Sequence, residues 1–413
     1  MTHFLRASLS FLIAVALSGG AVASAQTTDE LFNSGALNDI KLMLHSADWQ
    51  KLKDTYKENT YYPADITWGG NTVRNVGIRS RGLGSRHPLK PGLRVDFDRY
   101  SSGQRFLGLK SVVLDNLTQD PSMMKEVVAM ELFARMGLAA PRETFVRLYV
   151  NNTLVGLYGL VEAVDKQFLE RVFGENDGNL YEYDYTFDYN LEYLGSELDR
   201  YGIFKPQTNT SHSPFDLFGG IERMVRTAGE ASDAAFESAM AEFIDLRTFV
   251  RYVAVENYIA DDDGWLGIWG MNNFYMYQFE DRTQFQIISW DKDYTFLRAE
   301  HPIFERVDRN VLMRRAIQIP ALREIYLRTL AELADNASEG QQGGDAITGW
   351  MGRTVDRLYA MIASDARTDT NKPYTNAQFE EAAQTLRNYA RYRPWSVRCQ
   401  IAAEAPALAT CAQ

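Results

Sequence analysis

The order of strand-type and helix-type segments divides this chain into two unlike parts. Up to residue 164, most segments alternate apolar and polar residues as β-strands do, and from residue 165 onward apolar residues recur at helical spacing. The length of 413 residues exceeds the roughly 250–300 residues at which single hydrophobic cores stop growing. We therefore predict an α+β fold with a β-rich lobe over residues 26–164 and a mostly helical lobe over residues 165–413.

The individual elements follow from these two periodicities. Strands are expected at residues 64–68, 73–80, 93–97, 111–114, 144–150 and 153–162, with Asn151 and Asn152 as the turn between the last two. Helices are expected at residues 122–136, 165–173, 214–227, 234–243, 246–260, 321–333, 348–364 and 376–392. Polar, turn-forming residues predict loops at 338–344 and 368–374.

The first 25 residues have the features of a secretory signal. Arg6 precedes an apolar run over residues 9–17, and Ala23-Ser24-Ala25 supplies the small residues that signal peptidase prefers. Cleavage near Ala25 would give a secreted, periplasmic or cell-surface protein. A retained N-terminal anchor is the alternative, although the apolar run is short for a membrane span of about 20 residues.

The composition is that of a folded, acidic protein. Hydrophobic residues make up 46% of the chain, and the formal net charge is −11. Binding to nucleic acid requires a basic footprint, so this balance argues against nucleic acid as the main partner. No other apolar run reaches the length of a membrane span, so none is expected in the mature chain.

Two cysteines, Cys399 and Cys411, lie close together near the C-terminus. An exported chain tends to oxidise such a pair into a disulfide that closes a short local loop. Two free thiols and half of a metal site are the alternatives, and the lack of a nearby histidine disfavours the metal.

Aspartate and asparagine gather around one predicted β-hairpin, whose arms at residues 274–279 and 285–288 join across a turn at 280–283. Antiparallel pairing would bring Asn272 or Asn273 beside Asp291, and the aspartates at 261–263 end the preceding helical segment. Carboxylate and amide oxygens are the ligands that Mg²⁺ prefers. The hairpin therefore predicts a cation site, unless these residues only cap a helix and form turns.

The segment at residues 79–94 combines glycines with basic residues between two predicted strands. Glycines let backbone N–H groups approach an anion, and arginine or lysine adds charge-assisted hydrogen bonds to phosphate. The spacing matches neither of the common glycine-rich nucleotide motifs. Phosphate binding and an exposed basic hairpin loop remain the two interpretations.

Several motifs occur together in one order along the chain. They are residues 76–79 with Arg81-Gly82, then 106–110, 114–116, 156–165, 178–181, Asp263-Gly264, 272–277 and 289–293. As a set, they closely resemble the CotH kinase family, the spore-coat protein H group. The resemblance covers roughly residues 30–300. It implies an atypical protein-kinase-like fold with an inserted catalytic hairpin, and transfer of the ATP γ-phosphoryl group to protein hydroxyls, including those of secreted or surface proteins.

The resemblance also implies catalytic and metal-binding roles. Asp263 corresponds to the catalytic-loop aspartate, with Asp262 as the alternative because three aspartates adjoin. Asn273 and Asp291 would hold Mg²⁺ or Mn²⁺, with Asp293 assisting. The order Asp, Asn, strand, Asp is also the order in which protein kinases place their catalytic base and two metal ligands.

For the nucleotide, Arg79, Arg81 and Lys90 are the candidate phosphate contacts, and Glu162 would orient a phosphate-contacting base or a metal. Two positions depart from the family pattern. Arg81 stands where lysine is frequent, and Glu182 reverses the charge at another position where lysine is frequent. If either position is the phosphate lysine, activity would be weak or absent.

The function predicted from the sequence is thus a secreted kinase that uses ATP and a divalent cation and acts on a secreted or surface protein. The alternative is a non-enzymatic surface or adhesion protein that holds Ca²⁺ in its acidic cluster and binds a glycan or a protein through its aromatic residues. Metal-assisted hydrolysis would usually need more histidine or carboxylate ligands than the hairpin offers.

Overall fold

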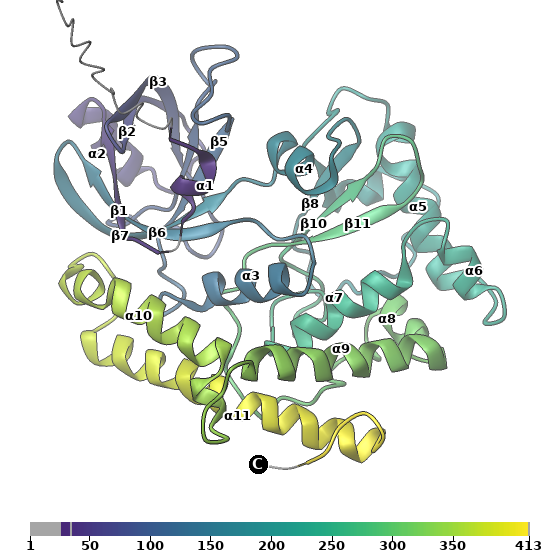
Figure 1. The fold of residues 1–413 in the computed structure, drawn as a ribbon. Coiled ribbons are helices and arrows are strands. Elements are labelled where there is room, and N and C mark those ends of the chain that lie inside the picture. Colours follow the sequence, from purple (N-terminus) through teal and green to yellow (C-terminus); the bar gives the residue numbers. More distant parts are fainter. Residues whose placement is uncertain (1–25, 34, 412–413) are drawn as a thin grey trace, which may run out of the picture.

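The structure is a computed structural model that describes residues 26–33 and 35–411, and it has a mixed α/β fold (Figure 1). The predicted signal segment, residues 1–25, lies outside the described residues. In Figure 1, a β-barrel stands on one side, a smaller sheet on the other, and a layer of helices runs beneath both.

Seven strands form the closed barrel, in the order β1-β2-β3-β4-β5-β7-β6. Their bounds are β1 Asn38–Met43, β2 Tyr62–Trp68, β3 Asn71–Ser80, β4 Leu93–Asp96, β5 Ser111–Asp115, β6 Glu143–Val150 and β7 Thr153–Glu162. Neighbouring strands pair antiparallel except β1 and β6, which close the barrel in parallel. The interior is filled by buried apolar side chains such as Ile78, Leu114 and Leu160, as the alternating pattern predicts.

Four strands form the second sheet, in the order β11-β10-β8-β9. Their bounds are β8 Asn179–Tyr183, β9 Phe204–Pro206, β10 Phe274–Gln278 and β11 Phe285–Ser289. β10 and β11 form the predicted antiparallel hairpin, with Phe274 opposite Ser289. This register brings the residues before β10 next to those after β11, which positions the candidate site.

The helices fill the space around these sheets. Their bounds are α1 Thr28–Leu31, α2 Ser46–Asp54, α3 Lys125–Arg135, α4 Lys166–Phe173, α5 Pro214–Glu230, α6 Phe236–Met240, α7 Leu246–Tyr258, α8 Val311–Ala316, α9 Pro320–Ser338, α10 Trp350–Thr368 and α11 Asn376–Glu404, with short 3-10 turns at Leu198–Ile203 and Ala346–Thr348. α9, α10 and α11 build the lower layer of Figure 1, and α7 packs on α9. No helix in the described part of the chain is long and apolar enough to cross a membrane.

The expected strands and helices are present, with ends shifted by a few residues, but the sequence missed several shorter elements. β1, α2, β8, β9 and α8 were not predicted, so the second part of the chain is less purely helical than expected. α11 also continues through Pro394 to Glu404, whereas the predicted helix ended at residue 392. The buried Arg393 holds this region by donating hydrogen bonds to the carbonyl oxygens of Tyr258 and Asn257.

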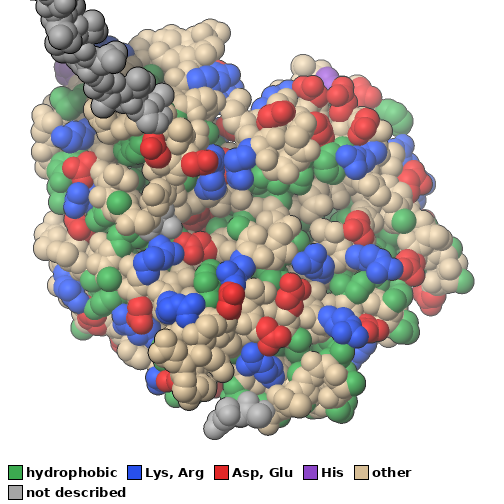
Figure 2. Space-filling model, viewed as in Figure 1, with side chains coloured by type: hydrophobic (Ala, Val, Ile, Leu, Met, Phe, Trp, Pro, Cys, Tyr) green, Lys and Arg blue, Asp and Glu red, His purple; other side chains and the backbone are tan. Residues whose placement is uncertain are grey.

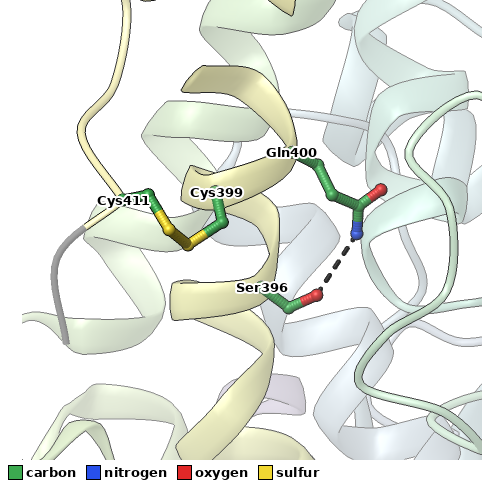
Figure 3. Close-up of a disulfide and its surroundings, with 4 residues drawn as sticks. All are labelled: Ser396, Cys399, Gln400 and Cys411. Carbon is green, nitrogen blue, oxygen red and sulfur yellow. Dashed lines mark hydrogen bonds between the residues drawn. A yellow bond between two sulfur atoms is a disulfide. The ribbon is translucent and has the colours of Figure 1, made fainter. Parts of the chain in front are cut away.

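The predicted disulfide is present. Cys399 in the last turns of α11 is bonded to Cys411, and Figure 3 shows the bridge tying the chain beyond α11 back onto that helix. On the same turn, the Gln400 side chain donates a hydrogen bond to Ser396 Oγ at 3.2 Å. The cysteines thus form a local closure, as the sequence indicated.

Candidate functional site

A cavity of about 780 Å³ lies between the loop that follows β3 and the ends of β8, β10 and β11. Six of the residues singled out in the sequence line it: Arg79, Arg81, Asp263, Asn273, Asp291 and Asp293. The barrel contributes the arginines together with Gly82, Gly84 and Arg86, and the second sheet contributes the acidic and amide side chains. The glycine-containing segment and the hairpin therefore meet at one cavity.

Asp263 and the two asparagines before β10 form a hydrogen-bonded group. The Asp263 carboxylate accepts from Asn273 Nδ2 at 2.9 Å and from Asn272 Nδ2 at 3.2 Å. Asn273 has a φ of 56°, a left-handed conformation that asparagine tolerates better than most residues. Burial raises the pKa of Asp263, which suits a carboxyl group that exchanges a proton. Because the amide nitrogen of Asn273 points to Asp263, its amide oxygen is the atom able to serve a cation.

Lys292 lies behind this group and fixes its geometry. Its ammonium is fully buried, 2.8 Å from Glu256 Oε1 and 2.8 Å from Asp261 Oδ2, and it donates to the Asn273 carbonyl oxygen at 3.1 Å. Burial alone lowers the pKa of Lys292, but the two carboxylates outweigh it and hold that pKa well above its usual value. Lys292 therefore ties the chain after β11 to the chain after α7.

Gly264 makes this close packing possible. A Cβ atom at position 264 would lie 2.4 Å from Asp261 Oδ2 and 2.6 Å from Glu256 Oε1, so these carboxylates would have to shift away from their contacts with Lys292. Trp265 donates its backbone N–H to the other oxygen of Glu256 at 2.8 Å. Glycine at this position thus allows the segment that carries Asp263 to turn tightly around the buried ion pairs.

Asp291 lies in an excess of negative charge. It follows β11 with a φ of 50°, and its pKa is raised to about 6, first by burial and then by Asp115, while Arg81 opposes the shift. Asp293 shares this environment, and burial followed by repulsion from Asp291 raises its pKa as well. An added positive charge is therefore favoured here.

The donor set fits a cation that also takes ligands from a bound molecule. Among residues 26–33 and 35–411, no group of three or more His, Cys, Asp or Glu side chains forms a ready-made metal cage. Mg²⁺ usually takes one or two carboxylates and completes its octahedron with water and phosphate oxygens. Asp291 and the Asn273 amide oxygen match that sparse set, with Asp293 on the same cavity wall.

The wall contributed by the loop after β3, with Arg79, Arg81 and Arg86, is cationic, and we call it the arginine wall. Arg81 lies over the Trp290 ring, 5.5 Å from its centroid, with a nitrogen 3.7 Å from Asp115 Oδ2. Burial lowers the pKa of Arg81, but the carboxylates of Asp115 and Asp291 raise it by a larger amount. The net pKa is raised, so the guanidinium stays charged. Arg86 holds the loop by donating to the Gly82 carbonyl oxygen at 2.6 Å. The glycine-containing segment is thus a braced loop rather than a free basic hairpin.

Three predicted residues lie elsewhere. Lys90 is fully buried in an ion pair with Asp369 at 2.8 Å and points into the protein. Glu162 pairs with Arg142 at 2.7 Å and with Arg171, beside a different, smaller cavity. The Asp262 carboxylate pairs with Arg306 Nη2 at 2.7 Å, outside the lining of the main cavity. The structure therefore favours Asp263 over Asp262, and Arg79 and Arg81 over Lys90.

Sequence reasoning missed Asp115, Arg86 and Lys292. Asp115 ends β5, and its charge acts on Asp291, Asp293 and Arg81. A signal for it existed, since residues 114–116 are one of the motifs that carry the family resemblance. Lys292 stands between two candidate ligands, Asp291 and Asp293, but no sequence feature shows that it turns inward.

Comparison with known proteins identifies the family to which this sequence is similar. The sequence model of the family described as "CotH kinase protein" matches residues 78–397. The inner spore coat protein H of Bacillus subtilis is 23% identical over 310 residues, 72% of this chain and 81% of that protein.

Fungal relatives come from Rhizopus delemar. Its invasin CotH3 is 24% identical over 211 residues, 48% of this chain and 34% of that protein. Its spore coat protein homolog 1 is 20% identical over 358 residues, 78% of this chain and 55% of that protein. The alignments thus span between a third and about half of these fungal proteins.

Proposed function

The chain belongs to the CotH kinase protein family, and from this premise we propose that it transfers the γ-phosphoryl group of ATP to a protein hydroxyl with the help of Mg²⁺ or Mn²⁺. We propose further that the barrel and the helical part act as the two lobes of an atypical kinase, with the cavity as the nucleotide site. The family match supports the first step, and the position of the cavity supports the second.

One observation carries the proposal: arginines from the loop after β3 and carboxylates from the segments next to β10 and β11 line the same cavity. ATP brings a polyanionic tail and, with it, a divalent cation, so its site needs positive charge for phosphate oxygens and oxygen ligands for the cation. Arg79 and Arg81 supply the first, and Asp291 with Asn273 supplies the second. A site for an uncharged ligand would need neither.

The side chains then divide the work. Arg79 and Arg81 bind the β- and γ-phosphate oxygens through charge-assisted hydrogen bonds. Asp263, oriented by Asn272 and Asn273, positions the acceptor hydroxyl and accepts its proton. Asp291 and Asn273, with Asp293 beside them, would hold the divalent cation, which would supply positive charge to offset that of the phosphate oxygens. Positioning and electrostatics supply most of the acceleration, since phosphoryl transfer demands little covalent work from the protein.

The proposal includes a location outside the cytoplasm. The relatives are named as a spore coat protein and invasins, and the disulfide between Cys399 and Cys411 suits an oxidising compartment. The acceptor is therefore a secreted or surface protein.

The test is transfer of label from γ-labelled ATP by the purified mature protein with Mg²⁺ or Mn²⁺. Label on a protein acceptor is expected for the wild type and for Asp281→Ala, a change to an exposed aspartate at the hairpin turn. It is expected to vanish in Asp291→Ala. Equal or absent label in all three, combined with tight Ca²⁺ binding, would instead support the non-enzymatic surface protein.

A further inference from the structure

Aromatic side chains line the mouth of the cavity on the same side as Asp263. Tyr185, Phe187 and Trp269 belong to the lining, and Tyr294 packs beside Trp269 with ring centroids 6.1 Å apart. Phe187 is 72% exposed and Trp269 is 43% exposed, although large aromatic residues usually gain free energy by burial. We call Tyr185, Phe187 and Trp269 the aromatic rim.

The aromatic rim is built from two segments that are locked together. The backbone N–H of Asp188 donates to the Trp269 carbonyl oxygen at 2.6 Å, and the N–H of Met271 donates to the Tyr189 carbonyl oxygen at 2.9 Å. Between them, Gly270 has a φ of 110°, and a Cβ at position 270 would lie 2.9 Å from the Tyr189 backbone nitrogen. The aromatic rings are thus presented by a fixed backbone.

The same backbone is hydrogen-bonded to the segment that carries Asp263. The N–H of Asn272 donates to the Gly264 carbonyl oxygen at 3.0 Å, so the chain that carries Trp269 is fastened next to Asp263. The side chain of Asn272 in turn contacts the Asp263 carboxylate. A molecule that touches Trp269 therefore has a defined position relative to Asp263.

The charged groups around the rim are already paired with one another. Lys205 lies 2.7 Å from Asp184, and Arg309 lies 2.8 Å from Asp188. In contrast to Arg79 and Arg81, the rim offers apolar ring surface with little unmatched charge. An apolar side chain can pack on such a surface without leaving a polar group unpaired.

We propose that the aromatic rim binds the acceptor, and that the acceptor is an extended polypeptide whose hydroxyl residue is flanked by a large apolar or aromatic side chain. This inference rests on the proposed function. With the phosphate tail on the arginine wall, the acceptor reaches Asp263 over the rim, and its flanking side chain packs on Trp269 and Phe187. The acceptor oxygen then bonds to the γ-phosphorus, the bond from that phosphorus to the β–γ bridging oxygen breaks, ADP leaves, and the hydroxyl proton passes to Asp263.

The test uses synthetic glycine-rich peptides with one serine, flanked by phenylalanine, glycine, lysine or glutamate, together with γ-labelled ATP. We expect kcat/KM for the phenylalanine-flanked peptide to exceed that for the glycine-flanked peptide at least tenfold. In the double variant Phe187→Ala/Trp269→Ala, this preference is expected to fall to about twofold, mainly through a higher KM for the peptide. Phe215→Ala, which removes an aromatic ring that is 66% exposed on α5, serves as the matched control and should keep the preference.

Three outcomes would overturn the inference: a preference for charged flanks, a preference that survives in the double variant, or transfer of label to an oligosaccharide rather than to any peptide. Thermal unfolding of the variants checks that exposed substitutions leave the fold intact. If peptides are labelled in an Asp291-dependent way without any flank preference, only the inference fails. If no acceptor receives Asp291-dependent label, the proposed function fails with it.

Discussion

Two lysines with fully buried ammonium groups brace the two walls of the cavity, and they differ in how their charge is compensated. Lys90, in the barrel loop, pairs with one carboxylate, Asp369. Lys292, behind the hairpin, pairs with two, Glu256 and Asp261. Burial lowers the pKa of Lys90 despite its partner, whereas the pKa of Lys292 is raised because its two partners outweigh burial. The number of counter-charges therefore decides the sign of the shift.

The two lysines also connect the cavity to different parts of the helical layer. Lys292 joins the hairpin to the end of α7, next to the segment that carries Asp263. Lys90 joins the glycine-containing loop to the connection between α10 and α11, where Asp369 also accepts from the Leu157 backbone N–H at 3.1 Å. A Cβ at Gly156 would lie 2.4 Å from the Asp369 carboxylate, so glycine makes room for this contact. Each side of the cavity is thus fixed to the helical layer by a different buried lysine.

The largest effect is expected from Lys292→Met, because it leaves two buried carboxylates without their cation. Breaking a buried pair by removing one partner typically costs about 3–5 kcal/mol of folding free energy. Urea unfolding should show a loss in this range, with loss of any label transfer. Lys90→Met is the matched comparison, since it strands only one carboxylate that keeps the Leu157 N–H. A larger loss at Lys90 than at Lys292 would refute the comparison.

A smaller and pH-dependent effect is expected from Asp369→Asn, which leaves Lys90 without a counter-charge. The loss should be about 2–3 kcal/mol at pH 7. The pKa of Lys90 is already lowered by burial, so the unfolded chain binds more protons between the folded and unfolded pKa values. Stability therefore rises with pH through that window, and the penalty of the variant should shrink from pH 7 to pH 9. A penalty that grows with pH over that range would contradict the role of Lys90.

Asp291→Asn is expected to stabilise the protein when no divalent cation is present. Unlike the buried lysines, the Asp291 carboxylate lies among other negative charges that the nearby positive charges do not balance. Its folded pKa of about 6, raised by burial and then by Asp115, lies above the unfolded value. The folded state thus binds the extra proton, and this stability is lost as pH rises through 6. Asparagine cannot ionise, so the variant should gain about 1–2 kcal/mol at pH 7.5 and nothing at pH 3.

The measurement is urea unfolding at both pH values with a chelator, followed by thermal unfolding with added Mn²⁺. The cation should raise the Tm of the wild type and leave that of Asp291→Asn unchanged. Asp281→Asn, at the exposed hairpin turn, is the control. A variant less stable than the wild type at pH 7.5 would show that Asp291 is not under electrostatic strain.

The smallest effect is expected from Arg81→Lys, which keeps the charge of the arginine wall but loses the planar group above Trp290. The KM for ATP should rise about threefold to tenfold, the cost of roughly one weakened charge-assisted contact. Steady-state kinetics at fixed acceptor concentration measures it. An unchanged KM for ATP would show that Arg81 does not contact the phosphates. Lys90→Arg would not be an equivalent test, because Lys90 faces inward and pairs with Asp369.

Regular patterns made the framework predictable. The barrel strands from β2 to β7 and the hairpin are predicted by the alternation of apolar and polar residues. The position of the hairpin turn also predicts that Asn273 lies near Asp291. β9 has only three residues, too few for a periodic signal, and β8 is masked by its Tyr- and Asp-rich flanks although it is as long as β5. β8 is positioned by pairing with β10, almost one hundred residues later in the chain, and β9 is positioned by pairing with β8.

At the candidate site, the sequence could not predict the direction in which each side chain points. Lys90 and Arg81 lie in the same basic segment, and composition makes them equivalent candidates for phosphate. Only the distant Asp369 distinguishes them, because it draws Lys90 into the interior. Glu162 was misplaced for the same reason, since Arg142 and Arg171 hold it at another cavity. Spacing reports which residues are near in sequence, not which partner each one finds.

The parallel pairing of β1 with β6 has a consequence for how the barrel is made. Asn38 lies opposite Val146, so the first strand finds its second neighbour only after more than one hundred residues have intervened. Such a nonlocal closure is slow compared with hairpin formation, because the entropy of a long loop is lost before any contact compensates it. As long as β1 and β6 are not paired, each leaves an unpaired strand edge, and such an edge can pair with a strand from another molecule.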